Sequence, residues 1–209
     1  MSSWTFYLNL GIRHITDFQG MDHMLFIAAL VLPFTAKDIW AIIKLITAFT
    51  IGHTLSLIIA GLGIWEPSSL WVEFGIAASI LLMAFMGATG AANKWRKMGV
   101  GLAGAIGLVH GLGFGAYYAF IAKGQEFWYA ILPFTVGIEL GQVIIVCALI
   151  VVYWLTQNVL RVPRRSMEVF FAGILVALSL QLVVERGVQI LDDLAKEESA
   201  TFWKSKNNL

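Results

Sequence analysis

Charged residues are scarce in this chain. Asp, Glu, Lys and Arg make up 13% of its 209 residues, whereas a soluble domain usually carries about 25%. Hydrophobic residues make up 59%, and they come in long blocks. Because backbone polar groups in lipid must be satisfied within their own segment, these blocks predict helices. The composition therefore predicts an all-α, polytopic membrane helical bundle.

Other absences exclude further classes of protein. The net charge is only +1, so no basic or acidic field indicates a nucleic-acid partner. The single cysteine, Cys147, excludes an internal disulfide and a cysteine metal cluster. The first ten residues, "MSSWTFYLNL", lack both a positive segment and a small-residue cleavage site. We therefore expect no signal peptide.

Six apolar blocks have the length that a helix needs to cross a bilayer about 30 Å thick, at about 1.5 Å per residue. We place these transmembrane helices near residues 21–36, 39–62, 68–92, 98–122, 127–156 and 167–188. They form one transmembrane domain over residues 1–190. A polar C-terminal tail follows at residues 191–209, as a short helix or a disordered end.

The residues before the first span are half apolar. Their apolar side chains recur at helical spacing, at Trp4, Leu8, Ile12 and Ile15. This pattern predicts a short amphipathic helix lying at the outer membrane interface. Gly20 offers a break between this helix and the first span.

Lys and Arg concentrate in two of the connections between spans. They lie in "NKWRK" (93–97) and "RVPRR" (161–165), which follow the third and fifth spans. By the positive-inside rule, these two connections are cytoplasmic. Six spans then place both termini outside.

Ionisable and amide side chains occur within the predicted spans or beside them. Eight of them are candidate site residues: His14, Asp22, His23, His53, Glu73, His110, Glu139 and Gln142. Such groups are costly in a membrane and usually face the bundle interior and take part in function. The predicted topology puts Asp22, His23 and Glu73 in the outer quarter. It puts His53, His110, Glu139 and Gln142 near the middle of their helices. The set therefore predicts a column of polar groups from the outer face to the midplane.

The local sequence around the column is that of an interior site. In "TAFTIGHTLSL" (47–57), Thr47, Thr50 and His53 share one helical face. In "AIGLVHGLGFG" (105–115), glycines recur every four residues, a spacing that lets helices approach closely. Glu139 and Gln142 are three residues apart and also share a face.

Imidazoles and carboxylates that converge at one depth suit a divalent first-row metal ion. Imidazole binds Zn, Cu, Fe and Ni, and carboxylate completes the coordination shell. The imidazole must be unprotonated, which it mostly is at neutral pH, because its ordinary pKa is about 6.5. A proton relay uses the same residue types, and interhelical hydrogen bonding is the purely structural alternative.

Five segments resemble, in order, those of the HupE/UreJ family of small membrane proteins. The segments are "GIRHITDFQGMDHMLF" (11–26), "TAFTIGHTLSL" (47–57), "VEFGIAASI" (72–80), "GLVHGLGFG" (107–115) and "FTVGIELGQ" (134–142). The resemblance implies a multi-pass nickel or cobalt permease of the bacterial cytoplasmic membrane, associated with hydrogenase or urease maturation. It carries the family's polar positions onto all eight residues named above.

One departure from the family pattern concerns metal release. Where the resemblance leads us to expect a Glu-Asn pair, this chain has Met86 and Gly87. If such a pair helps the metal ion to leave on the inner side, its loss places inward release in doubt.

Three hypotheses follow from the sequence. The first is a permease for Ni²⁺ or Co²⁺ that captures the ion at Asp22, His23 and Glu73 and binds it at the midplane, with His14 folding back to complete the outer cluster. The second is an intramembrane metal-dependent hydrolase with Zn²⁺ held by histidines. The third is a non-transporting metal-binding subunit or sensor. Expected partners are the metal ion, the lipid bilayer and a second copy of the chain in a homo-oligomer.

Overall fold

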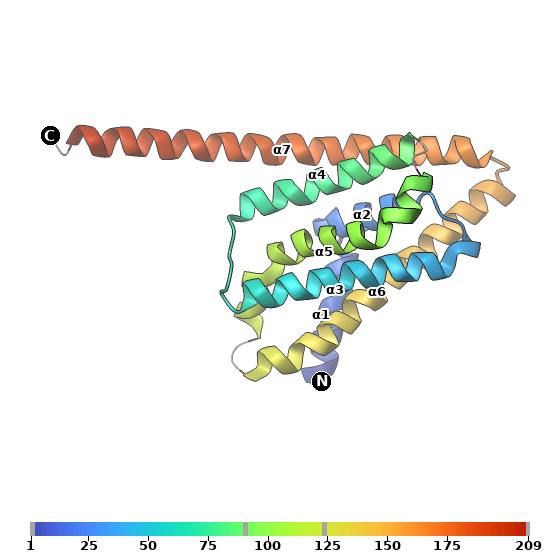
Figure 1. Ribbon diagram of the computed structural model, residues 1–209, viewed down its shortest axis with the longest axis horizontal. Coiled ribbons are helices and arrows are strands. Elements are labelled where there is room, and N and C mark those ends of the chain that lie inside the picture. Colours follow the sequence, from blue (N-terminus) through green and yellow to red (C-terminus); the bar gives the residue numbers. More distant parts are fainter. Residues whose placement is uncertain (1–2, 90–91, 123–124, 208–209) are drawn as a thin grey trace.

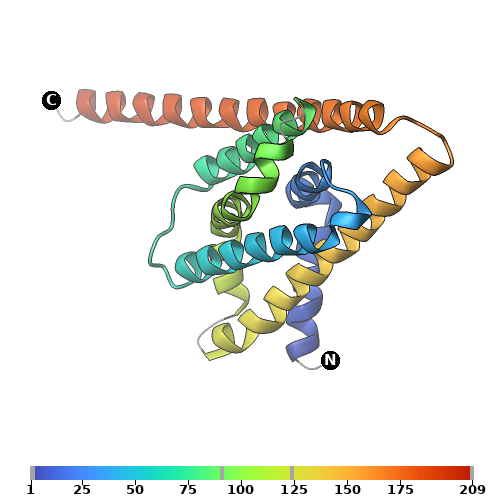
Figure 2. The same ribbon diagram turned by 45° about the vertical axis from the view of Figure 1, so that its right-hand side comes forward.

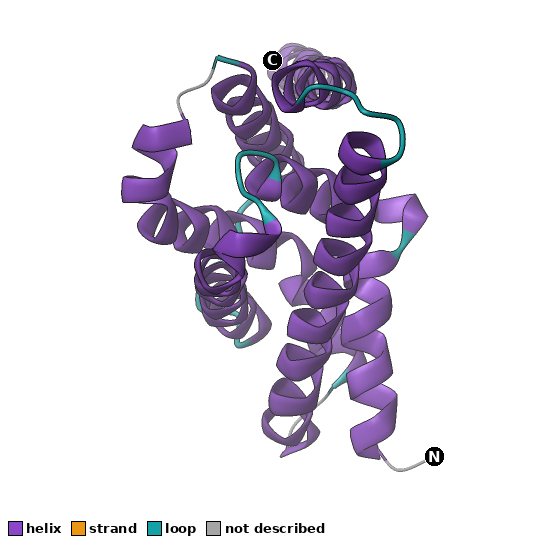
Figure 3. Cartoon of the chain, turned by 90° about the vertical axis from the view of Figure 1, so that its right-hand side faces the viewer, coloured by secondary structure: helices purple, strands orange, loops and turns teal. Residues whose placement is uncertain are grey.

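Helices connected by short segments make up the part of the chain that the computed structural model describes, residues 3–89, 92–122 and 125–207 (Figures 1 and 3). The α-helices are α1 (Ser3–Thr16), α2 (Asp22–Val31), α3 (Ile39–Gly61), α4 (Ser69–Ala88), α5 (Ala92–Ile121), α6 (Gln125–Asn158) and α7 (Arg164–Asn207). Two short 3-10 helices, Phe18–Gly20 and Ala36–Asp38, precede α2 and α3. No strand occurs within these ranges, which confirms the predicted all-α class.

The long helices have the length and composition of membrane spans. In the described ranges, four segments are long and apolar enough to cross a bilayer: Ala36–Gly61, Ser69–Ala88, Phe127–Asn158 and Arg164–Ala200. Helix α5 has 30 residues, and its described side chains include the apolar stretch Gly99–Gly115. The structure is thus the helical membrane bundle that the composition predicts.

The first predicted span, 21–36, is wrong. Helix α2 has 10 residues, about 15 Å of helix, which is too short to cross about 30 Å of hydrocarbon. The helix ends at Val31, two residues before Pro33, because Pro33 lacks the backbone N–H that the next helical hydrogen bond needs. The apolar run on which the prediction rested continues past this break as a turn.

Helix α1 is present as predicted, but it belongs to the interior packing of the bundle. Its Gly11 lies against Gly137 of α6, and a Cβ added to either glycine would overlap backbone oxygen of the other helix. In Figure 1, α1 runs across the direction shared by α3, α5 and α7. The residues it buries are Tyr7, Gly11 and Ile15. Of the predicted apolar face, only Ile15 is buried, because the helix packs through its small residues.

Helices α3 and α5 lie side by side in close backbone contact. A Cβ on Gly107 would overlap the carbonyl oxygen of Phe49, and one on Gly111 would overlap that of His53. The glycines at four-residue spacing therefore let the backbones of α3 and α5 touch. Such close packing of small residues holds membrane helices together. This contact places His110, between the two glycines, next to His53.

Two ends of the bundle can be distinguished. Arg164 donates a hydrogen bond to the carbonyl of Pro33, and Arg165 donates one to the carbonyl of Ala88, each at 3.1 Å. We refer to this end as the arginine end. At the opposite end, the Gly61 end, the ring of Phe127 lies against Gly61. Helix α3 runs from the arginine end to the Gly61 end.

Helix α7 continues through the predicted domain boundary. Its 44 residues extend over about 66 Å, and its C-terminal part projects beyond the other helices (Figure 2). The predicted tail from Leu191 is therefore helical up to Asn207 and is not a separate element. Residues 93–97, predicted as a connection, instead begin α5; their side chains lie outside the described residues.

The contact between α3 and α5 predicts the effect of Gly107→Ala. Because the new Cβ would overlap a backbone carbonyl, the helices must separate, which should lower the free energy of unfolding by about 1–3 kcal/mol. Thermal unfolding of the protein in detergent measures the change. The control is Gly101→Ala in the same helix, where a Cβ has nothing within 4 Å; alanine there should be neutral or stabilising. Equal stability of the two variants would contradict the packing role of Gly107.

Candidate metal centre

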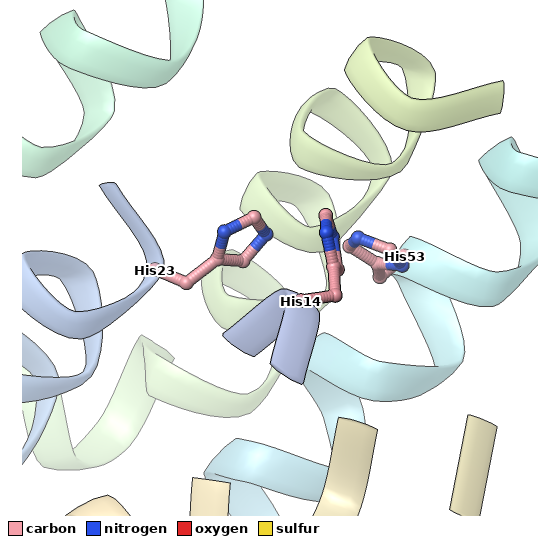
Figure 4. Close-up of side chains that lie close together, drawn as sticks. All are labelled: His14, His23 and His53. Atoms are coloured by element: carbon pink, nitrogen blue, oxygen red, sulfur yellow. The ribbon is translucent and has the colours of Figure 1, made fainter. Parts of the chain in front are cut away.

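Four histidines from four helices converge inside the bundle. They are His14 of α1, His23 of α2, His53 of α3 and His110 of α5. Ring nitrogens of the first three lie within 4.8 Å of one another, and Figure 4 shows these three rings together at the meeting point of their helices. The ring centroid of His110 is 5.3 Å from that of His23. We refer to the four residues as the imidazole group.

Local backbone features bring each ring to this point. The Gly11–Gly137 contact holds α1 against α6, so its last turn, with His14, reaches the interior. Residues 17–21 then interrupt the helix, and α2 restarts at Asp22 with His23 in its first turn. The glycines of α5 place His110 beside His53.

Five buried nitrogens of the imidazole group have no hydrogen-bond partner: Nε2 of His14, Nε2 of His23, both nitrogens of His53, and Nε2 of His110. Buried polar atoms are satisfied in the large majority of cases, so such a concentration is unusual. Nδ1 of His110 lies 3.0 Å from the carbonyl of Ile106. If Nδ1 donates its hydrogen there, the Nε2 lone pair is free to bind a ligand, as in metal-binding histidines.

Aromatic rings surround the imidazole group. Phe49 and Phe26 stack with their centroids 4.8 Å apart, and each lies within 5.3 Å of the His110 ring. On the other side, the Phe114 centroid is 4.0 Å from that of His14. This shell supplies no ligand atoms, and it fixes the ring orientations by packing.

The predicted carboxylate near the middle of α6 does not join the imidazole group. Thr47 and Thr50 of α3 donate hydrogen bonds to the two oxygens of Glu139, at 2.6 and 2.5 Å. The hydroxyl of Thr50 also lies 3.1 Å from Oε1 of Gln142, which is fully buried. These four residues form a network, which we refer to as the Glu139 network, one helical turn from His53. The threonine face predicted on α3 is thus directed at Glu139.

Of the other two predicted carboxylates, Glu73 is paired with an arginine that sequence reasoning missed. Nη1 of Arg186 in α7 lies 2.7 Å from Oε2 of Glu73 in α4. Asp22 interacts electrostatically with both groups. The signal that could have found the arginine was its place at the outer end of the sixth predicted span, at the depth predicted for Glu73. Asp22 lies within the first turn of α2, and Met21 occupies the cap position.

The eight predicted residues therefore fall into three places. His14, His23, His53 and His110 come together; Glu139 and Gln142 lie in the adjacent network; Asp22 and Glu73 lie with Arg186. This differs from the expected division, which grouped His23 with the outer carboxylates and left His14 to fold back onto them. The reason is the shortness of α2, because its first turn starts inside the bundle.

Met86 and Gly87, which stand where the family resemblance predicts a Glu-Asn pair, lie at the arginine end. Met86 packs against the hydrophobic core, and a Cβ on Gly87 would lie 3.2 Å from the Leu32 side chain. A cavity of about 580 Å³ lies at the same end, lined by residues that include Lys37, Trp154 and Arg164. Its lining includes none of the eight predicted residues.

The long apolar helices around a buried polar centre define a membrane protein with a helical bundle. A family model described as HupE / UreJ protein matches residues 1–186. The chain therefore belongs to the HupE/UreJ family, as the five sequence segments predict. No curated protein and no solved structure gives a match to this chain.

The Glu139 network predicts a cost for Thr50→Val. Valine keeps the shape but removes the hydroxyl that donates to a carboxylate oxygen, which should destabilise the protein by about 1–3 kcal/mol. Thr89→Val is the control, because the Thr89 hydroxyl is exposed and bonds only to carbonyls of its own helix. Thermal unfolding of both variants in detergent measures the difference. If Thr50→Val is no less stable than the control, the hydroxyl does not support Glu139.

Proposed function

We propose that the chain is a permease for a divalent first-row transition metal, Ni²⁺ or Co²⁺ first, and that the imidazole group is its binding site. The observation that supports this most is the set of five buried, unpartnered imidazole nitrogens contributed by four helices. Neutral imidazole is a good ligand for these ions, and metal binding would satisfy nitrogens that the protein leaves without partners.

The donor set favours transition metals over Ca²⁺ and Mg²⁺. These hard ions take oxygen ligands, whereas the imidazole group offers nitrogen only. Zn²⁺ and Cu²⁺ suit imidazole as well, and the usual affinity order places Cu²⁺ above Ni²⁺ and Co²⁺. Selection among transition metals would therefore depend on geometry and on metal supply.

The arrangement also suggests a direction of transport. The arginine end carries Lys37, Arg161, Arg164 and Arg165, which by the positive-inside rule places it in the cytoplasm. His53 lies eight residues from Gly61 and fourteen from Ile39, about 12 Å and about 21 Å along the helix. The imidazole group is then nearer the outer side of a bacterial cytoplasmic membrane. Both termini lie outside because α1, which packs parallel to α6 from Leu8 at Gly137 to Ile15 at Gly141, and α2 together take the place of the first predicted span.

The Glu139 network supplies a second binding site for the metal ion, on the inner side of the imidazole group. Thr47 lies six residues before His53 on α3, about 9 Å nearer the arginine end. A metal ion leaving the imidazoles inward would next meet the oxygens of Glu139, Gln142 and the two threonines. This route does not need a polar pair at Met86 and Gly87.

Histidine substitution tests the binding site. His53→Ala and His14→Ala should each weaken Ni²⁺ binding to the purified protein by at least about 100-fold, because each removes a ligand atom. Calorimetric titration in detergent measures the affinity, and thermal unfolding checks that each variant is folded. Unchanged Ni²⁺ affinity in folded His53→Ala and His14→Ala proteins would refute the proposal.

Glu139→Gln separates binding from movement. Because Glu139 lies outside the imidazole group, the variant should keep Ni²⁺ affinity within a few-fold of wild type but transport the ion more slowly into sealed proteoliposomes. Thr89→Val, outside the site, should keep both activities. Loss of binding together with transport would instead make Glu139 a direct ligand. Absence of flux in wild-type protein, with Zn²⁺-dependent hydrolysis, would support the metal-dependent hydrolase; absence of both, with metal bound, would support a sensor or subunit.

A role in hydrogenase or urease maturation, and assembly into a homo-oligomer, stay predictions of the family resemblance. Both concern what receives the ion or surrounds the bundle. Neither alters the chemistry proposed for the imidazole group.

A further inference from the structure

An arginine forms an ion pair with one of the two outer carboxylates. Arg186 Nη1 donates to Glu73 Oε2 at 2.7 Å, and the two side chains are only 31% and 37% exposed. Asp22 interacts electrostatically with Arg186 and Glu73. The Arg186–Glu73 ion pair joins α7 to α4, and Asp22 of α2 is near enough to interact with both charges; we refer to the three residues as the Arg186 triad.

The triad lies toward the Gly61 end of α4, next to the imidazole group in sequence. Asp22 directly precedes His23, whose ring faces His14 and His110. Glu73 lies four residues after Ser69, where α4 begins, about 6 Å along the helix. Because the Glu73 and Arg186 side chains are partly exposed, ions in solution can reach them before they reach the buried rings.

Packing of α7 on α4 holds the arginine in place. The two helices lie alongside each other in Figures 1 and 2. A Cβ on Gly187, the residue after Arg186, would lie 3.8 Å from the Phe74 ring, the residue after Glu73. A Cβ there would be in ordinary van der Waals contact, so the two helices are close at the level of the ion pair.

Two carboxylates near each other attract hard divalent cations. Ca²⁺ and Mg²⁺ take oxygen ligands and bind carboxylates readily. A guanidinium is permanently charged and matches carboxylate geometry. With Arg186 present, the triad carries one net negative charge, and an oxygen of Glu73 is already engaged by a donor.

We propose that Arg186 is a specificity-determining residue. Its guanidinium pairs with Glu73 and offsets the charge of Asp22, and so it excludes Ca²⁺ and Mg²⁺ from the approach to the imidazole group. This role rests on the proposed function, since it concerns which ions reach the metal site. The remaining negative charge still attracts cations, while selection for a transition metal is left to the imidazoles.

The test compares Arg186→Gln, Arg186→Lys and the double variant Arg186→Gln/Glu73→Gln as full-length purified proteins. Calorimetric titration with Ca²⁺ measures hard-ion binding, and titration with Ni²⁺ in millimolar Mg²⁺ measures competition. Arg186→Gln should gain Ca²⁺ binding and become Mg²⁺-sensitive for Ni²⁺. Wild type, Arg186→Lys and the double variant should do neither, because each keeps a cation or lacks the Glu73 carboxylate.

Arg165→Gln is the matched control. Arg165 is also an arginine of α7 near a glutamate, Glu168, but it lies at the arginine end. It should behave as wild type in both titrations. Thermal unfolding checks each protein, and Arg186→Met, which keeps the length of the apolar stem, replaces Arg186→Gln if the glutamine variant does not fold.

Two results would overturn the role of Arg186. One is a folded Arg186→Gln or Arg186→Met protein that neither binds Ca²⁺ nor becomes sensitive to Mg²⁺. The other is Ca²⁺ binding by Arg186→Lys equal to that of the glutamine variant, because then the positive charge is not what excludes the ion. Failure of wild-type protein to bind Ni²⁺ would refute the proposed function alone, since the Ca²⁺ titrations still decide the role of Arg186.

Discussion

Backbone contact between helices is the constraint on which this structure depends. At Gly107 and Gly111, α5 touches the backbone of α3, and at Gly11 and Gly137, α1 touches that of α6. In lipid, helix association depends on such close packing, because apolar side chains gain little by leaving the hydrocarbon for one another. The same two contacts determine where His53, His110 and His14 meet. Fold and candidate site therefore have a common cause.

The interior that results is divided by chemistry. Nitrogen donors gather in the imidazole group, within a shell of phenylalanines. Oxygen ligands lie to either side, in the Glu139 network and the Arg186 triad. Threonine hydroxyls already donate hydrogen bonds to Glu139, and a guanidinium already pairs with Glu73. This division is the basis of our proposal that the histidines bind the metal ion and that the carboxylates act on its entry and release.

Much of this was predictable from residue types and spacing. The shortage of charge predicts the membrane bundle, the five segments predict the HupE/UreJ family, and the threonine face of α3 predicts a polar partner, which is Glu139. The length of α2 was not predictable from hydropathy, because apolar residues continue through the turn at Pro33. Nor was the place of α1, whose interior packing depends on a tertiary contact with α6. Arg186 was missed because its partner is more than a hundred residues away in sequence.

The central claim is that the four imidazoles bind a divalent transition metal, and X-ray absorption spectroscopy of the Ni²⁺-loaded protein tests it most directly. Wild-type protein should show nitrogen ligation with the multiple scattering of coordinated imidazole. His53→Ala should bind less nickel and show fewer imidazole ligands. Nickel coordinated by oxygen alone, or an imidazole signal unchanged by removal of His53, would contradict the claim.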